Sequence, residues 1–390
     1  MIPRISLTAW LVVVTGMSAM AQADWKNDWQ PSVANRTDQE FPRINSERRA
    51  QFRIRAPEAK DVSVSIGRPL TVTKDDEGNW TITTSPLDVG FHFYRVLIDG
   101  ANVADPATEI FVGGGGLSSA VEVPTGEDFH EMKEVPHGEV RERQYYSQVT
   151  EEWRRMFVYT PPGYNDNTST HYPVLYLQHG GCEDERGWPV QGRVSAIMDN
   201  LIAEGKAQPM LIVMERGYAL KPGEEPFRFQ PPRDGQRMPP LDFDRIFATL
   251  EEVFIGEVIP LIDNTYRTRA DRKHRAMAGL SWGGMQTRTI GLGNLDTYSQ
   301  FGLFSGGSID PAIITDMAEF KEKVDVAFIG YGSRELPEGV NRSGEEPKAN
   351  VAALRQAGIN AVFYVSPETA HEWHTWRRCL HQFAPLLFKE

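Results

Sequence analysis

The feature that most constrains the fold is an alternation of apolar strands with helices, which begins at about residue 140. Runs such as YPVLYLQ and PMLIVM are almost wholly apolar, and segments with helical spacing, such as VSAIMDNLIAEG, separate them. Strands that are apolar on both faces are typical of a parallel sheet covered by helices on both sides. The sequence therefore predicts an α/β domain over residues 140–390.

The part of the sequence before residue 140 follows a different pattern. Short runs such as AQFRIRA, NWTITT and FHFYRVLI have strand character, and turn sequences such as DDEG and DG separate them. Several short strands at this spacing indicate a small all-β sandwich over residues 40–124. Residues 24–39 are then an N-terminal extension, and the polar residues 125–139 are a linker to the α/β domain.

The first 23 residues have the composition of a secretory signal peptide. Arg4 precedes an apolar run from Leu7 to Met20, and Ala21-Gln22-Ala23 provides a small-x-small cleavage site. We expect cleavage near Ala23 and a periplasmic or secreted protein. No later segment reaches about 18 consecutive apolar residues, so we expect no membrane insertion.

Charge and cysteine content exclude several classes of function. The chain has 41 Lys and Arg against 53 Asp and Glu, a net charge of −12, and no basic patch. We therefore expect no nucleic-acid partner. Two cysteines, Cys182 and Cys379, are too few for a disulfide scaffold. Whether they form one bridge stays open at this point, as does the oligomeric state.

The sharpest motif is the G-x-S-x-G sequence from Gly279 to Gly283, with Ser281 at its centre. An apolar strand, RAMAG, precedes it, and a segment that can open a helix follows it. A serine on such a strand-to-helix turn projects its Oγ out of the sheet, where the hydroxyl can act as a nucleophile. We therefore predict that Ser281 is the catalytic nucleophile.

A serine nucleophile needs a histidine base, and in this arrangement the base follows the acid in the chain. Three histidines follow Ser281 in the sequence, namely His371, His374 and His381. His371 precedes the amphipathic run of the last helix, whereas His374 and His381 lie within it and are expected at its surface. We predict His371 as the base. A His-Glu-x-x-His zinc motif would need histidine where Thr375 stands, so we predict no metal and no cofactor.

The acid that orients the histidine should follow a late strand of the sheet. Glu335 has this place after the strand VAFIGYG and is our first candidate. Asp310, in the loop after FGLFSGGS, remains an alternative, whereas Asp325 precedes its strand and would lie at the wrong end of the sheet.

Backbone amides should stabilise the charge that develops on the substrate carbonyl. One is the amide of Trp282, directly after the nucleophile, and the second is the amide of Gly181 in the sequence HGGC. We expect the side chain of His179 to brace this loop rather than to react.

Several of these segments resemble a known family. YPVLYLQHGG, LIAEGKAQPMLIVM, HRAMAGLSWGGMQT and SPETAHEWHTWRRCLHQFAPLLF are similar to the esterase-D-like α/β-hydrolases of carbohydrate esterase family 1, over residues 140–388. That family includes feruloyl and acetylxylan esterases. The amino-terminal segment resembles the immunoglobulin-like module related to carbohydrate-binding module family 48.

The resemblance implies an α/β-hydrolase fold and a serine carboxylesterase that removes feruloyl or acetyl groups from plant polysaccharide such as arabinoxylan. An esterase for a siderophore of the enterochelin type, or for another small ester, is the alternative. A third interpretation, from a different class, is a carbohydrate-binding protein with a degenerate hydrolase domain. The sequence leaves the acyl and sugar specificity open, and also whether the amino-terminal module binds glycan.

Three positions depart from the family pattern. Trp282 stands where methionine is usual, and its larger ring can reshape the acyl pocket. Glu335 stands where aspartate is usual, and Arg216 stands where a neutral residue is common.

Overall fold

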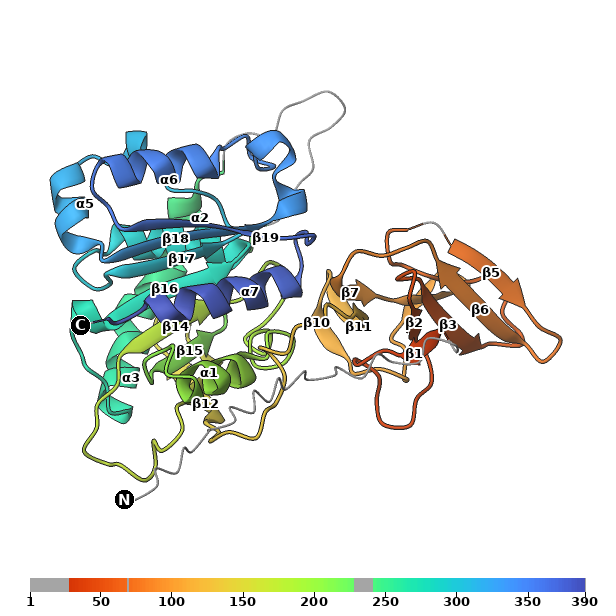
Figure 1. The fold of residues 1–390 in the computed structure, drawn as a ribbon. Coiled ribbons are helices and arrows are strands. Elements are labelled where there is room, and N and C mark those ends of the chain that lie inside the picture. The colour runs from red at the N-terminus through yellow and green to blue at the C-terminus, as the bar shows by residue number, and fades with distance from the viewer. Residues whose placement is uncertain (1–27, 69, 228–240, 390) are drawn as a thin grey trace, which may run out of the picture.

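The computed structural model describes residues 28–68, 70–227 and 241–389. These residues form an amino-terminal all-β part and a larger α/β part, which lie side by side (Figure 1). The predicted signal peptide, residues 1–23, lies outside the described residues. Within them, no helix has both the length and the apolar character needed to cross a membrane.

The α/β part is built on one eight-stranded sheet of the described residues, in the order β12-β13-β15-β14-β16-β17-β18-β19. Its strands are β12 (Glu139–Ser147), β13 (Glu152–Thr160), β14 (Val174–Gln178), β15 (Leu211–Glu215), β16 (Arg275–Leu280), β17 (Gln300–Phe304), β18 (Val326–Gly332) and β19 (Ala361–Ser366). β13 pairs antiparallel with β12 on one side and with β15 on the other, and every pairing from β15 to β19 is parallel. The predicted α/β fold with a mostly parallel sheet is confirmed.

Helices cover both faces of this sheet (Figure 1). Two of them, α1 (Val194–Ala203) and α7 (Trp373–Phe383), pack on one face. The opposite face carries α2 (Phe243–Val253), α3 (Ile259–Thr265), α5 (Met317–Lys323) and α6 (Pro347–Gln356). Both faces of the central strands are buried by this arrangement, which explains why their sequences are apolar throughout.

Shorter helical segments connect these elements. They are η1 (Phe254–Val258), η2 (Arg272–His274), α4 (Trp282–Gln286), η3 (Thr287–Gly291), η4 (Pro311–Ile313), η5 (Ser333–Glu335), η6 (Pro337–Gly339) and η7 (Ala384–Leu386). The sequence FDRIFATLEEVFIGEVIPLIDNTY predicts one long helix. The structure has this continuous helical run from Phe243 to Thr265, in which the π-helical segment η1 lies between α2 and α3.

The amino-terminal part consists of strands. They are β1 (Trp29–Pro31), β2 (Arg43–Asn45), β3 (Ala50–Arg55), β4 (Val62–Val64), β5 (Leu70–Lys74), β6 (Asn79–Thr84), β7 (Gly90–Tyr94), β8 (Val96–Ile98), β9 (Ala101–Val103), β10 (Phe111–Gly113) and β11 (Gly116–Val123). Phe52 and Ile82 from the five-stranded sheet β1-β2-β3-β6-β5 share a core with Val62 and Val121 from two three-stranded sheets. The immunoglobulin-like topology stays a prediction, as do the domain boundaries.

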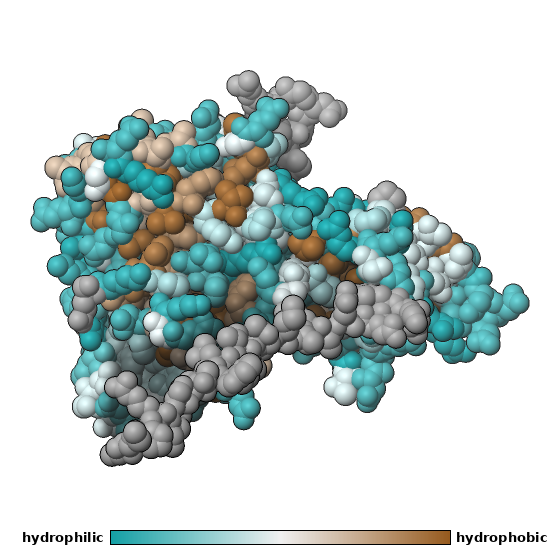
Figure 2. Space-filling view, in the orientation of Figure 1, coloured by the Kyte–Doolittle hydropathy of each residue, from teal (hydrophilic) through white to brown (hydrophobic). Residues whose placement is uncertain are grey.

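Side chains on the face drawn in Figure 2 are mostly hydrophilic on both parts, and apolar residues form smaller groups over the α/β part.

The two cysteines do not form a bridge, because Cys182 is exposed and Cys379 is buried, and both are free thiols.

Candidate active site

The nucleophile candidate lies on a strained turn between β16 and α4. Ser281 has φ 49° and ψ −112°, a conformation that residues other than glycine rarely adopt. A Cβ atom on Gly279 would lie 2.4 Å from the carbonyl carbon of Gly283, and one on Gly283 would lie 2.6 Å from the carbonyl oxygen of His179. The two glycines of the motif are therefore required by close backbone contacts on either side of the serine.

His371 lies between β19 and α7, and its ring connects Ser281 with Glu335. The distance from His371 Nε2 to Ser281 Oγ is 2.9 Å, and the distance from His371 Nδ1 to Glu335 Oε2 is 2.6 Å. The structure therefore brings together the three residues that the sequence analysis selected from positions up to 90 residues apart.

The Glu335 carboxylate is held in place by further hydrogen bonds. Its other oxygen, Oε1, accepts hydrogen bonds from the Ser305 hydroxyl at 2.7 Å and from the Gly332 amide at 2.8 Å. Burial alone would raise the pKa of Glu335, but the hydrogen bond and charge of His371, with the Ser305 and Gly332 bonds, lower it below its ordinary value. The carboxylate is therefore charged at neutral pH and oriented toward His371.

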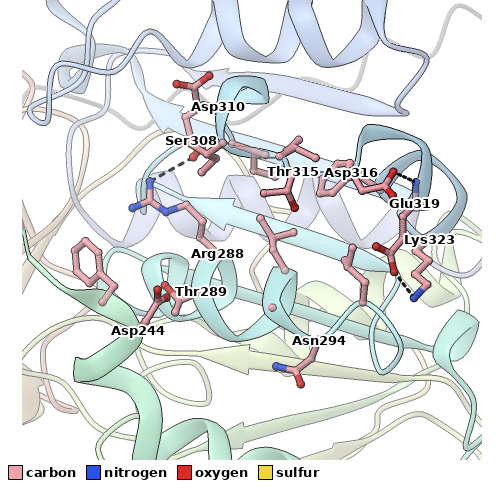
Figure 3. Close-up of a pocket in the computed structure, with 18 of the residues that line it drawn as sticks. Asp244, Arg288, Thr289, Asn294, Ser308, Asp310, Thr315, Asp316, Glu319 and Lys323 are labelled. Atoms are coloured by element: carbon pink, nitrogen blue, oxygen red, sulfur yellow. Dashed lines mark hydrogen bonds and ion pairs between the residues drawn. The ribbon is translucent and has the colours of Figure 1, made fainter.

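The alternative acid, Asp310, lies elsewhere. Its carboxylate accepts a hydrogen bond from the Ala312 amide at 2.9 Å and caps η4. Asp310 lines an open pocket of about 880 Å³ together with Arg288 and Ser308 (Figure 3). Asp325 directly precedes β18, at the end of the strand opposite to Glu335. Of the three carboxylates, only Glu335 contacts His371.

The loop after β14 approaches the nucleophile. A Cβ atom on Gly180 would lie 3.6 Å from the Cβ of Ser281. The Gly180 amide donates a hydrogen bond to Glu183 Oε2 at 3.0 Å, and the Cys182 amide donates one to Tyr218 Oη at 2.7 Å. Within the described residues, the Gly181 amide between them donates to no acceptor, which leaves it available to a substrate oxygen.

The other predicted donor, the Trp282 amide, is the first of α4. An amide at this position has no acceptor within its helix. His179 braces the loop as expected. Its Nε2 accepts a hydrogen bond from the Gly217 amide at 2.9 Å, and its Nδ1 lies 2.9 Å from the Gly180 carbonyl oxygen.

Sequence reasoning missed Glu183, which connects this loop with the helix after His371. Oxygen Oε1 of Glu183 accepts from the Trp373 indole at 2.9 Å, while Oε2 accepts from the Gly180 amide. Burial raises the pKa of Glu183 to about 8. A glutamate two residues after a glycine pair carries no local signal of this role.

The Trp282 side chain, directly after the nucleophile in the chain, belongs to an aromatic cluster. Its ring stacks on Phe227, with centroids 5.6 Å apart and an interplanar angle of 19°, and meets Phe247 edge-on at 5.0 Å. Arg216, the other departure from the family pattern, is half-exposed and lies 3.5 Å from Glu152.

The expectation that His374 is a surface residue is wrong. Its side chain is fully buried, because the amino-terminal part and the linker pack against this side of α7. The Nε2 atom lies 2.7 Å from Glu127 Oε2, and burial lowers the pKa of His374 to about 4. His381 is partly exposed and contacts the ring of Phe129.

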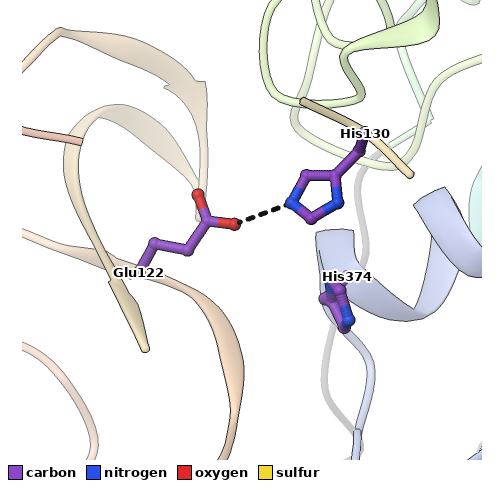
Figure 4. Close-up of side chains that lie close together, drawn as sticks. All are labelled: Glu122, His130 and His374. Carbon is purple, nitrogen blue, oxygen red and sulfur yellow. Dashed lines mark ion pairs between the residues drawn. The ribbon is translucent and has the colours of Figure 1, made fainter. Parts of the chain in front are cut away.

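One group of possible metal ligands occurs among the described residues, formed by Glu122, His130 and His374 (Figure 4). Their ligand atoms lie within 4.8 Å of one another. Both carboxylate oxygens of Glu122, however, pair with guanidinium groups, of Arg377 and of Arg193. This donor set therefore suits an ion-pair network better than a cation.

A serine on a strand-to-helix turn, followed in the chain by an acid and then a histidine at the carboxyl edge of a parallel sheet, defines the class of α/β-hydrolases. The sequence also matches the model of the family named Esterase, described as "Putative esterase", over residues 147–385. The chain therefore belongs to the Esterase family of carboxylic ester hydrolases.

Curated relatives contain a similar segment within longer proteins. The endo-1,4-β-xylanase/feruloyl esterase of Xylanibacter ruminicola is 41% identical over 383 residues, which cover 95% of this chain and 49% of that protein. The endo-1,4-β-xylanase Y of Acetivibrio thermocellus is 25% identical over 261 residues, which cover 60% of this chain and 22% of that protein. The chain thus spans about half of the first relative and less than a quarter of the second.

Solved structures share the fold. The ferulic acid esterase of Anaeromyces mucronatus has a TM-score of 0.54 and 24% identity, over 67% of this chain and 95% of that chain. The enterobactin esterase of Shigella flexneri has a TM-score of 0.58 and 17% identity, over 86% of this chain and 92% of that chain. At these identities the likeness concerns the fold alone.

Proposed function

We propose that this chain is a secreted serine carboxylesterase that removes feruloyl or acetyl groups from plant polysaccharide such as arabinoxylan. The observation that carries the proposal is the continuous hydrogen-bonded path from Ser281 through His371 to Glu335. The relative named endo-1,4-β-xylanase/feruloyl esterase supports this substrate class. Secretion rests on the composition of residues 1–23, and sequencing the mature amino terminus after export tests it.

The proposed reaction has two half-reactions. Ser281 Oγ attacks the ester carbonyl while His371 Nε2 takes its proton, and the Trp282 and Gly181 amides donate to the oxyanion. The leaving alcohol takes that proton from His371, and the acyl group stays on Ser281. Water then attacks the acyl-enzyme while His371 takes one of its protons, and His371 returns this proton to Ser281 Oγ as the acid leaves. Glu335 holds the imidazole orientation and stabilises its positive charge throughout.

The stacked rings of Phe227 and Trp282, of which Trp282 directly follows the nucleophile in the chain, are our reason to propose an aromatic acyl group. The two rings stack on each other, and Phe227 is partly exposed. Aromatic rings bind one another through offset or edge contacts worth about 0.5–1.5 kcal/mol beyond burial. A feruloyl group can use such contacts and an acetyl group cannot, so we propose ferulate as the preferred acid.

A panel of esters tests the proposal. Methyl ferulate, p-nitrophenyl acetate, feruloylated and acetylated xylo-oligosaccharides, and a catecholate lactone are compared with the parent chain and with Ser281→Ala. Losing a triad nucleophile costs on the order of 10⁶-fold in kcat. Activity of Ser281→Ala within tenfold of the parent would refute the nucleophile. Ser343→Ala, an exposed serine distant in sequence, serves as the control.

Two alternatives have distinct outcomes in this panel. A clear preference for the catecholate lactone would assign the siderophore-type activity, for which the fold likeness to the enterobactin esterase gives a reason. Failure of the parent chain to react with a fluorophosphonate probe would indicate a carbohydrate-binding protein with a degenerate hydrolase domain.

For the amino-terminal part we propose an immunoglobulin-like module related to carbohydrate-binding module family 48. The fold likeness that covers 86% of the chain extends beyond the α/β part and supports a shared two-part arrangement. Pull-down of the full chain on insoluble xylan, with Ser281→Ala to prevent turnover, tests whether it binds glycan.

A further inference from the structure

The amino-terminal part reaches the two loops that carry His371 and Glu335. Arg334 directly precedes Glu335, and its Nη1 lies 2.6 Å from Asp88 Oδ1, in the loop before β7. Asp88 also pairs with Arg68 at 2.8 Å, so its carboxylate has partners in both parts of the chain. This ion pair holds Arg334, the residue directly before the candidate acid Glu335.

A second contact fixes the residue next to the base. Glu372 directly follows His371, and its Oε2 accepts from the Phe91 amide of β7 at 3.0 Å. The same carboxylate caps the amino-terminal end of α7, because it also accepts hydrogen bonds from the amides of His374 at 2.7 Å and Thr375 at 3.0 Å. Burial raises the pKa of Glu372 to about 7.

The backbone of β7 lies directly against the start of α7. A Cβ atom on Gly90 would lie 2.8 Å from Glu372 Oε2 and 2.9 Å from the Cβ of His374. Gly90 also has φ 108°, which side chains other than glycine's rarely permit. This close approach leaves little room for the amino-terminal part to shift relative to the His371 loop.

Two ion pairs hold the next turn of α7 to the same surface. Arg377 pairs with Glu122 of β11, and both side chains are almost fully buried. Arg378 pairs with Glu127 at 2.8 Å, and Glu127 also binds His374. Burial would raise the pKa of Glu122, but the charges of Arg377 and Arg193 lower it well below its ordinary value. The helix after His371 is thus tied to the amino-terminal part and the linker along its first two turns.

We infer that the amino-terminal part is a positioning component of the active site, in which Asp88 and the Phe91 amide hold the loops of Glu335 and His371 in register with Ser281. The inference rests on the proposed function, because it assumes that these residues act on an ester. Its distinctive consequence is that hydrolysis of a small ester, which has no glycan to bind, also depends on this part of the chain.

The test uses the full chain with Asp88→Asn, Arg334→Gln, the double variant and the conservative Arg334→Lys. Arg53→Gln is the matched control for Arg334→Gln, because Arg53 is also half-exposed and its Nη2 lies 3.8 Å from Asp75 Oδ2 within the amino-terminal part. With p-nitrophenyl acetate we expect kcat to fall about tenfold at nearly constant KM, since misplacement by 1 Å can cost on the order of 10²-fold. The double variant should lose no more than the worse single variant, and Arg334→Lys should recover part of kcat.

A second measurement does not need turnover. The proton between His371 Nδ1 and Glu335 gives a downfield ¹H resonance, which should shift or broaden in Arg334→Gln and stay unchanged in Arg53→Gln. If the parent chain hydrolyses no ester, the proposed function fails, and this resonance alone decides the positioning inference. An unchanged resonance overturns it. If the parent is active, the inference is also overturned when the variants keep kcat on the small ester but have a raised KM on xylo-oligosaccharide. The amino-terminal part would then only bind glycan.

Discussion

Replacement of Glu335 by glutamine tests the site most directly. In the parent, Glu335 Oε2 accepts a hydrogen bond from His371 Nδ1, and Oε1 accepts hydrogen bonds from Ser305 and Gly332. The oxygen of a glutamine keeps the two bonds to Ser305 and Gly332, so its NH₂ group faces Nδ1. The imidazole must then present a bare Nδ1 and carry its proton on Nε2, where it can no longer accept the proton of Ser281.

The magnitude follows from this tautomer change. An acid-to-amide exchange that leaves the geometry intact lowers kcat of a serine hydrolase by about 10⁴-fold. This factor corresponds to about 5.5 kcal/mol of transition-state stabilisation. The KM should stay within about twofold, because Glu335 is buried and its carboxylate bonds to His371, Ser305 and Gly332.

The assay is steady-state hydrolysis of methyl ferulate and p-nitrophenyl acetate by Glu335→Gln, beside Asp310→Asn. Asp310 is the alternative acid of the sequence analysis, and its carboxylate is bound to the Ala312 amide. We expect Asp310→Asn to keep kcat within about twofold, since surface changes away from the site have small effects. A large loss in Asp310→Asn with little loss in Glu335→Gln would refute the assignment.

Three further predictions concern buried groups. Glu183 has an ordinary pKa of 4.5 and a folded pKa of about 8, so the folded chain retains a proton that the unfolded chain releases between these values. The contribution of Glu183 to the free energy of unfolding therefore falls as pH rises from 5 to 8, by up to about 1.4 kcal/mol per pH unit. In urea titrations over that range, the free energy of unfolding of Glu183→Gln should fall less than that of the parent. Glu122→Gln leaves Arg377 buried without a charged partner, so the free energy of unfolding in urea at pH 7 should fall by about 3–5 kcal/mol. The control is Glu47→Gln, at an exposed pair with Arg49, which should lower it by less than about 1 kcal/mol. An aromatic disulfide reagent should modify one thiol of the native chain, Cys182, because Cys379 is buried and burial raises its pKa; rapid modification of two thiols would contradict this.

The parts of the site that sequence could predict are those with a local pattern. Ser281 stands in a turn whose glycines are dictated by contacts within a few residues, and His371 follows from the order of residues in the chain. Glu335 could be selected because side chains that follow parallel strands meet at one edge of the sheet. The position of Asp310 after a neighbouring strand satisfies the same rule, so only the structure separates the two.

The parts that sequence could not predict depend on contacts between distant segments. His374 has the spacing of a surface residue on α7, and its burial is caused by the linker and the amino-terminal part, which no local pattern places there. The role of Glu183 likewise depends on Trp373, 190 residues away. The apolar pattern of the predicted long helix gives no sign of the π-helical turn η1 within it.

The attachment of the amino-terminal part to α7 also has a consequence for folding. Phe91 and Glu372 are 281 positions apart, and Glu122 and Arg377 are 255 positions apart. Contacts of such long range form late, because the loop between them must first be ordered. The strands of residues 28–123 can pair among themselves beforehand, but their docking surface does not exist until the segment from His371 to Arg378 is in place. Since that segment also supplies the base, catalytic competence and attachment of the two parts are acquired in the same late step.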